Sequence, residues 1–176
     1  INKNKIKEND LILAIPSNGI HSNGYSLVRH ILNKKKINIK KDSFLKKELI
    51  KPTKIYVSEV LNLSDNKLLN GCANITGGGI VDNLKRIIPN NLCAEIDLYK
   101  IKILEIFRWL KNQNISDGEM LKTFNCGVGF CLVINSKNLK KVINFFPKNL
   151  KPYVIGKVTR ASKKIKLNGQ IKWYWK

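Results

Sequence analysis

The sequence predicts an α/β (α+β) domain in which a mixed β-sheet is layered with helices. Short apolar runs that suit buried strands alternate with amphipathic segments along the whole chain of 176 residues, and this alternation is typical of a layered sheet. The strongest strand signal is the apolar run over residues 126–134. Asn168-Gly169, a pair that favours tight turns, predicts a hairpin over residues 165–175 and therefore a sheet that is not purely parallel.

The individual elements follow from the spacing of the apolar residues. The expected strands cover residues 10–15, 72–75, 92–96, 126–134 and 153–159. The expected helices, in which apolar residues recur three and four positions apart, cover residues 25–34, 43–50, 53–63, 80–88, 103–110 and 139–146. Pro52 and Pro89 end the helices before them, because proline lacks the N–H that a helix needs.

The chain is long enough for a single domain with its own core, and no linker or repeat divides residues 1–176. It begins with Ile1 rather than Met, as a fragment or an excised domain would. No apolar run reaches the ~20 residues that span a bilayer, so we expect no membrane partner. Four cysteines without a CxxC spacing indicate small buried side chains in a reducing cytosol, so we expect a cytoplasmic protein without a bound metal.

The net charge of +21 raises the possibility of a nucleic-acid-binding module. However, the chain has 29 Lys and only 4 Arg, and Asn (22) and Ile (24) are also abundant. A selected nucleic-acid surface usually keeps Arg for bidentate contacts with phosphates and bases. We therefore favour a compositional drift toward Lys, Asn and Ile over specific nucleic-acid binding.

Residues 17–24, between the first expected strand and the first expected helix, form the strongest candidate for a ligand site. A strand, a loop of small polar residues and a helix together offer backbone N–H groups to an anion. Gly19 and Gly24 let a ligand approach the main chain, and His21 can change protonation near neutral pH. The side-chain donors are Ser17, Ser22 and Asn23. We expect a phosphate or a phosphorylated metabolite here, with His21 as the catalytic candidate.

Two further glycine-containing stretches follow a similar pattern. Thr76-Gly77-Gly78-Gly79 lies between a strand and a helix, and it fits a second phosphate contact as well as a tight crossing. Residues 123–129 place Asn125 before a buried strand, and Gly127 and Gly129 are expected to share one face of that strand. There, close packing of a neighbouring element is favoured over a ligand, with Asn125 a weaker candidate for phosphate binding.

Other residues carry weaker signals. His30 lies inside an expected helix and is not assigned a function. The aromatic tail 173–175 could stack on nucleic-acid bases, but packing of the tail onto the body of the domain is favoured.

Taken together and in order, these motifs resemble the C-terminal half of phosphoribosylformylglycinamidine cyclo-ligase, also called aminoimidazole ribonucleotide (AIR) synthetase. The similar stretches are SNGIHSNGYSLVR (17–29), PTKIYV (52–57), ITGGG (75–79), DNLKRIIP (82–89), EMLKTFNCGVG (119–129) and IGKV (155–158). The resemblance covers residues 5–159 and implies the mixed sheet and the helical layers of that domain.

The resemblance implies a purine-biosynthetic reaction. Family members use ATP and Mg²⁺ to phosphorylate the formyl amide oxygen of formylglycinamidine ribonucleotide (FGAM). An amidine nitrogen of the same molecule then attacks, phosphate leaves, and the imidazole ring of AIR closes. The resemblance also implies an N-terminal half that carries much of the ATP-binding apparatus and the main contact of a homodimer. This chain is then half of an enzyme and is expected to be inactive alone.

The resemblance is incomplete at three positions and leaves other members of a wider superfamily open. Asn74, Asp82 and Lys122 stand where the family pattern implies His, Glu and Arg. The alternatives are FGAM synthase, selenophosphate synthetase and thiamine-monophosphate kinase, which share the domain plan. The combination of HSNGYSLVR, PTKIY and TFNCGVG favours the cyclo-ligase.

Overall fold

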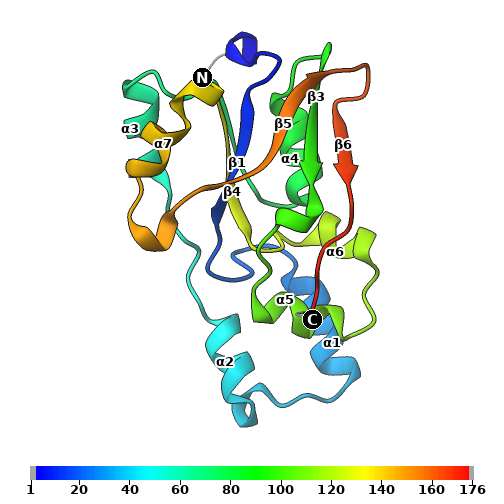
Figure 1. The fold of residues 1–176 in the computed structure, drawn as a ribbon. Helices are drawn as coiled ribbons and strands as arrows, with labels where there is room; N and C mark the ends of the chain where they lie inside the picture. Colours follow the sequence, from blue (N-terminus) through cyan, green and yellow to red (C-terminus); the bar gives the residue numbers. More distant parts are fainter. Residues whose placement is uncertain (1–2, 175–176) are drawn as a thin grey trace.

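The computed structural model describes residues 3–174 and contains a six-stranded sheet (Figure 1). The strands are β1 (Leu11–Pro16), β2 (Gly71–Asn74), β3 (Leu92–Asp97), β4 (Val128–Ile134), β5 (Tyr153–Arg160) and β6 (Ile165–Asn168). Their order in the sheet is β2-β4-β1-β5-β3-β6. All neighbours pair antiparallel except β3 and β6, which are parallel. The prediction of a mixed sheet is therefore confirmed.

Helices follow most strands, as the alternating pattern predicts. Within the described residues they are α1 (Tyr25–Lys34), α2 (Ser43–Leu49), α3 (Val57–Asp65), α4 (Gly79–Ile87), α5 (Glu105–Lys111), α6 (Asp117–Thr123) and α7 (Leu139–Asn144). Within that same span of the chain, no helix is long and apolar enough to cross a membrane.

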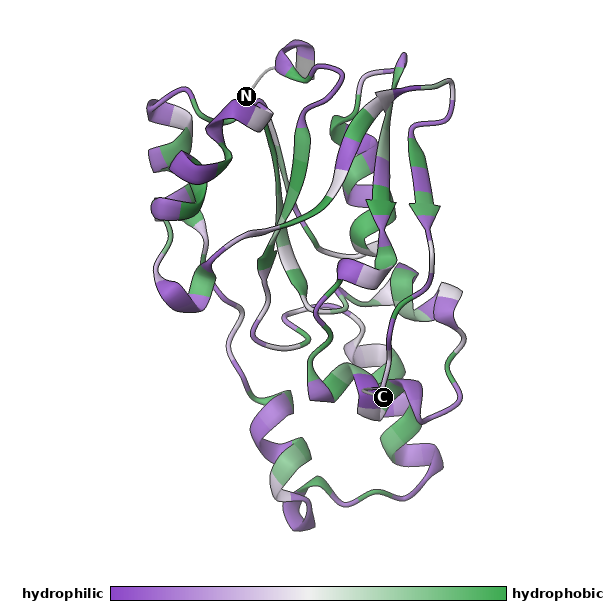
Figure 2. Ribbon diagram, in the orientation of Figure 1, coloured by the Kyte–Doolittle hydropathy of each residue, from purple (hydrophilic) through white to green (hydrophobic). Residues whose placement is uncertain are grey.

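Side chains of the central strands alternate between two hydrophobic cores, one on each face of the sheet. Ile12 and Ala14 of β1 face the larger core with α1, α4, α5 and α6, whereas Leu13 and Ile15 face a smaller core with α3 and α7. This alternation is the period-2 geometry of a strand that is buried on both faces. In Figure 2 the central strands are mainly hydrophobic, and the helices carry polar residues between apolar ones.

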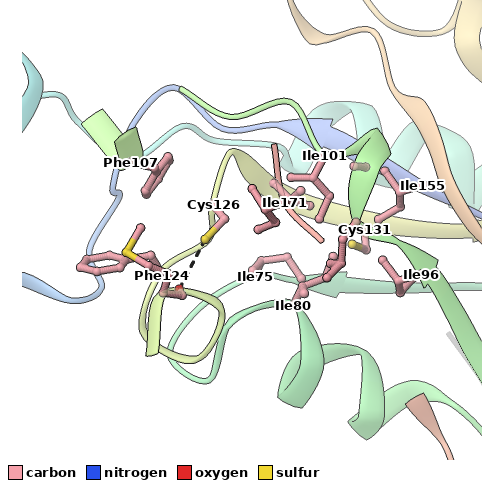
Figure 3. Packing of buried hydrophobic residues seen from close by; sticks show 14 of the residues in the cluster. Ile75, Ile80, Ile96, Ile101, Phe107, Phe124, Cys126, Cys131, Ile155 and Ile171 are labelled. Atoms are coloured by element: carbon pink, nitrogen blue, oxygen red, sulfur yellow. Dashed lines mark hydrogen bonds between the residues drawn. The ribbon is translucent and has the colours of Figure 1, made fainter. Parts of the chain in front are cut away.

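The larger core connects the sheet to the region where several loops meet. Figure 3 shows Ile80 of α4 beside Ile96, Cys131 and Ile155 of the sheet. Phe107 and Phe124 extend the same cluster beyond the strand ends, with ring centroids 6.2 Å apart. The larger core thus supports both the sheet and the loops after β1 and β2.

The expected hairpin over residues 165–175 is wrong. β6 ends at Asn168 and pairs in parallel with β3, and no strand follows it in the described residues. Gly169 has a φ of +73°, and a Cβ there would lie 2.3 Å from the Tyr99 ring. The chain therefore turns away from the sheet, and Trp173 is buried against the helices instead. Trp175 lies outside the described residues.

Two other boundaries differ from expectation, and one helix was not expected. Residues 53–56 are not helical, and α3 begins only at Val57. The strand expected from residue 126 begins at Val128, because Gly127 turns with a φ of +92°. Helix α6 was not among the expected elements. Its signal was the capping box of Ser116 and Glu119, in which the Ser116 hydroxyl accepts the Glu119 N–H at 3.2 Å.

Candidate functional site

The loop after β1 leads into α1 through a left-handed glycine. Gly24 has a φ of +80° and caps α1 without a side-chain hydrogen bond. A Cβ at Gly24 would lie 2.2 Å from the Phe124 ring, so only glycine fits between the loop and this aromatic side chain. The first N–H groups of α1 have no partner within the helix. Because the first turn of α1 also has no acidic residue, its N-terminus suits an anion. We call residues 17–24 the α1 corner.

Asn125 holds the α1 corner from more than 100 residues away in the sequence. Its side-chain amide donates to the carbonyl oxygens of Gly19 (2.9 Å) and Ile20 (3.1 Å). Its Oδ1 accepts from the Ser17 hydroxyl and the Gly127 N–H, both at 2.9 Å. Asn125 is only 2% exposed, so its interactions shape the loop and leave none of the amide for a ligand.

His21 is a buried residue of the α1 corner and is neutral at neutral pH. It is 6% exposed, and its Nε2 lies 2.8 Å from Asn18 Oδ1. Burial, and secondarily the charge of Lys54, lower the pKa of His21 below its ordinary value of 6.5. The backbone φ of +61° at His21 is unusual for a residue with a Cβ. The loop conformation therefore depends on contacts that hold this residue in place.

The segment before α3 covers the outer side of the α1 corner. The Asn18 side-chain amide donates to the Pro52 carbonyl at 3.1 Å, and the Ser22 hydroxyl lies 2.8 Å from that of Thr53. The Tyr56 hydroxyl donates to the Pro16 carbonyl at 3.1 Å. The PTKIY motif thus anchors the SNGIHSNGY motif, which explains why the two occur together.

Gly129 is the point where this anchor meets the sheet. A Cβ on Gly129 would lie 1.8 Å from the Tyr56 hydroxyl and 3.0 Å from the His21 ring. A Cβ on Gly127 would meet the Lys102 carbonyl instead, at 2.2 Å. The expectation of close packing at both glycines is therefore confirmed, although they do not share one strand face.

The loop after β2, residues 76–79, forms a second corner that we call the α4 corner. Helix α4 also starts behind a left-handed glycine, Gly78, with a φ of +91°. The Asn83 side-chain amide donates to the carbonyls of Gly79 (2.7 Å), Gly77 (3.3 Å) and Thr76 (3.4 Å). A buried amide therefore holds this loop too, but it comes from the helix that the loop begins.

The two corners meet in space. Asn23 Oδ1 lies 3.7 Å from the position that a Cβ on Gly77 would occupy. Phe124 packs its ring on Gly24, and its carbonyl oxygen would lie 3.2 Å from a Cβ on Gly79. Two helix N-termini thus flank one residue, and two sets of backbone N–H groups are available at one place on the surface.

The predicted site residues divide into accessible and buried groups. Ser22 and Gly77 are exposed, and Asn23, Thr76 and Gly78 are half-buried, so these five can reach a ligand. The buried ones are Ser17, Gly19, His21, Gly79 and Asn125. Sequence reasoning missed Phe124 and the role of Asn83. The available signal for Asn83 was a polar residue on the apolar face of α4, beside Ile80 and Leu84.

Two cavities open beside the corners. One, of about 370 Å³, is lined by Lys54, Tyr56, Asn74 and Phe130 together with the exposed apolar side chains of Ile55, Val57 and Leu61 and by Val60. The other, of about 320 Å³, is lined by Gly78, Val81, Asp82, Gly118, Leu121, Lys122 and Leu167. Asn74, Asp82 and Lys122, which from the sequence we expect to differ from the family, all line these two cavities.

Metal-ligating side chains do not gather in the described part of the chain. Among residues 3–174, no group of three or more His, Cys, Asp or Glu is placed to hold a metal ion. All four cysteines are free, and three of them are buried.

Comparison with known proteins identifies the family. The profile described as "AIR synthase related protein, C-terminal domain" matches residues 7–167. A phosphoribosylformylglycinamidine cyclo-ligase of Ligilactobacillus salivarius is 39% identical over 163 residues, which are 88% of this chain and 47% of the relative. A trifunctional purine biosynthetic protein adenosine-3 of Gallus gallus is 37% identical and is covered over 17% of its length.

Solved structures show the same fold in more distant proteins. Thiamine-monophosphate kinase from Stenotrophomonas maltophilia matches with a TM-score of 0.63 and 14% identity, over 97% of this chain and 53% of that one. T. maritima PurL complexed with ADP matches with a TM-score of 0.57 and 13% identity, over 95% of this chain and 24% of that one. The chain spans about half the length of the cyclo-ligase relative that it matches. It belongs to the AIR synthase related protein family and corresponds to that family's C-terminal domain.

Proposed function

We propose that this domain supplies the substrate-phosphate site of an ATP-dependent cyclo-ligase that converts FGAM to AIR in purine (IMP) biosynthesis. The observation that carries the proposal is the meeting of two glycine-capped helix N-termini over Phe124. Such an arrangement binds anions through backbone N–H groups without any lysine or arginine. The names of the curated relatives support the choice of reaction.

The α1 corner is the better place for the phosphate of FGAM. The first turn of α1 has no acidic residue, whereas the first turn of α4 carries Asp82 beside Gly78. The Asp82 carboxylate, so close to Gly78, would repel the negative charge of a phosphate at the α4 corner. Ser22 and Asn23 add side-chain donors at the α1 corner. Thr76 and Gly77 of the α4 corner lie on the other side of the ligand.

Catalysis in this reaction rests on positioning and on charge stabilisation. Phosphorylation turns the formyl oxygen into a leaving group, and ring closure then needs the amidine nitrogen held against the formyl carbon. Binding the distant phosphate at the α1 corner fixes one end of the substrate. A catalytic role for His21 stays a prediction. Its Nε2 already contacts Asn18 Oδ1, so proton transfer to substrate requires that contact to open.

The other requirements fall mainly on the polypeptide that the longer relatives have beyond this domain. We infer that ATP and Mg²⁺ bind there, and that the complete enzyme is a cytoplasmic homodimer. Binding of a nucleotide to PurL, a protein of the same fold, is compatible with that assignment. Neither a membrane nor a specific nucleic acid is needed as a partner.

The decisive experiment joins this chain to the N-terminal half of the Ligilactobacillus salivarius relative and measures AIR formation from FGAM and ATP. The joined enzyme is expected to be active, and the chain alone inactive. In the joined enzyme, Asn23→Asp adds a negative charge at the α1 corner and should raise the KM for FGAM by roughly tenfold or more. Asn33→Asp, at the opposite end of α1, is the matched control. Equal KM values in both variants would exclude the α1 corner as the phosphate site.

A further inference from the structure

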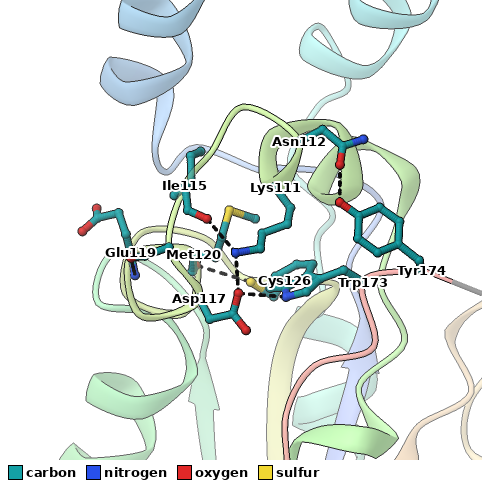
Figure 4. A network of polar contacts seen from close by, with 10 residues as sticks. Lys111, Asn112, Ile115, Asp117, Glu119, Met120, Cys126, Trp173 and Tyr174 are labelled. Carbon is teal, nitrogen blue, oxygen red and sulfur yellow. Dashed lines mark hydrogen bonds and ion pairs between the residues drawn. The ribbon is translucent and has the colours of Figure 1, made fainter.

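The C-terminal tail continues beyond the part of the chain that matches the family. The match ends at residue 167, yet residues 169–174 leave the sheet and run along α5 and α6 (Figures 1 and 4). Trp173 is 6% exposed and belongs to the larger core. A buried tryptophan in a segment outside the family pattern requires a physical explanation of its own.

Hydrogen bonds fix both the backbone and the side chain of Trp173. Its carbonyl oxygen accepts from Arg108 Nε at 2.7 Å, and its indole N–H donates to Asp117 Oδ1 at 3.1 Å. Lys111 completes the network, because its ammonium group pairs with Asp117 and donates to the Ile115 carbonyl at 2.8 Å (Figure 4). The pairing with Lys111 and the bond from Trp173 lower the pKa of Asp117, which is therefore ionised at neutral pH.

Asp117 is the first residue of α6, and α6 leads directly into the candidate site. The Phe124 N–H donates to the Met120 carbonyl at 3.0 Å, and the Cys126 thiol contacts the same carbonyl at 3.4 Å. Residues 124 and 125 follow the helix without any intervening loop. Phe124 supports both corners, and Asn125 holds the α1 corner. A shift of this short helix would therefore move both supports together.

We propose that Trp173 is a positioning residue for the phosphate site, which it controls by fixing α6 and hence Phe124 and Asn125. The role rests on the proposed function of the α1 corner. Trp173 acts through Asp117, the first of the seven residues of α6, and does not touch a ligand. The tail is thus part of the binding apparatus, although its sequence lies outside the family pattern.

The test uses Trp173→Phe, which keeps an aromatic ring in the core but removes the indole N–H. Tyr174→Phe is the matched control, because it removes an exposed hydroxyl that donates to Asn112 and leaves Asp117 untouched. Amide exchange is followed at Gly127, whose N–H donates to Asn125 Oδ1, and at Ser17, whose N–H donates to the Gly127 carbonyl. The distant reporter is Leu68, whose N–H donates to the Leu63 carbonyl in the smaller core. FGAM affinity is measured with the same substitutions in the joined enzyme.

Trp173→Phe should speed exchange at Ser17 and Gly127 by roughly fivefold to tenfold, as expected for one lost hydrogen bond, and should weaken FGAM binding. Exchange at Leu68 should be unchanged in Trp173→Phe, and exchange at all of these sites should be unchanged in Tyr174→Phe. Faster exchange at Met120 alone would overturn the proposal, because α6 would loosen without moving the corner. Equal acceleration at Leu68 would also overturn it, by showing a general loss of stability. If the joined enzyme binds no FGAM but the exchange responds as expected, the coupling stands and the proposed function fails.

Discussion

The α1 corner and the α4 corner solve the same structural problem in two ways. Each begins a helix behind a left-handed glycine, and each uses a buried asparagine to bind loop carbonyls. At the α4 corner, Asn83 lies only four residues from the Gly79 carbonyl that it binds most closely. At the α1 corner, Asn125 lies 106 residues from Gly19. One loop is held locally, and the other depends on distant parts of the fold.

This difference predicts when and how firmly each corner forms. A contact within one helix turn costs little chain entropy, whereas a contact across about 100 residues forms only after the sheet has brought the segments together. Asn125 follows α6 and precedes β4, which pairs with β1 directly before the α1 corner. The α1 corner therefore takes its buried amide from a distant part of the chain, whereas the α4 corner takes it from the helix that it begins.

The largest effect is expected from Asn125→Ala. The change leaves two carbonyls, one N–H and one hydroxyl without partners in a buried place, at about 1–3 kcal/mol for each group that stays unsatisfied. Allowing for relaxation, we expect the free energy of unfolding to fall by about 3–5 kcal/mol. Urea unfolding at pH 7 measures it. Asn33→Ala, an exposed change in α1, is the control. A loss no larger than that of the control would show that the remote support is dispensable.

Asn83→Ala should lower the free energy of unfolding by less, about 1 kcal/mol, although it removes a similar number of hydrogen bonds. Two of its three donated bonds are long, at 3.3 and 3.4 Å. Alanine also favours the helix by roughly half a kcal/mol relative to asparagine, which offsets part of the loss. The same urea titration provides the comparison. If Asn83→Ala proves as costly as Asn125→Ala, sequence separation does not distinguish the two corners.

The sequence revealed the two corner loops more easily than the buried side chains that hold them. Glycines between a strand and a helix are visible as local patterns, and so both corners could be identified. The partner of a buried amide is not visible in this way, because Gly19 and Asn125 become neighbours only through the pairing of β1 with β4. The expected hairpin failed for a related reason. Asn168-Gly169 favours a turn locally, but the burial of Trp173 against α5 and α6 decides where the chain goes.

The smallest expected effect is a difference between the two corners in how their amide exchange responds to pH. Since the pKa of His21 is lowered on folding, the unfolded chain binds a proton more readily than the folded one. The contribution of neutral His21 to the free energy of unfolding is therefore fully present above pH 6.5, the ordinary pKa of His. It declines as the pH falls below that value. After correction for intrinsic rates, amide exchange from pH 7.5 to 5 should accelerate at Ser17 and Gly127 before Gly79, whose N–H donates to the Thr76 carbonyl. His21→Gln should remove this order. If both corners instead loosen together in the unmodified chain, protonation of His21 acts on the whole domain, and the α1 corner has no separate response.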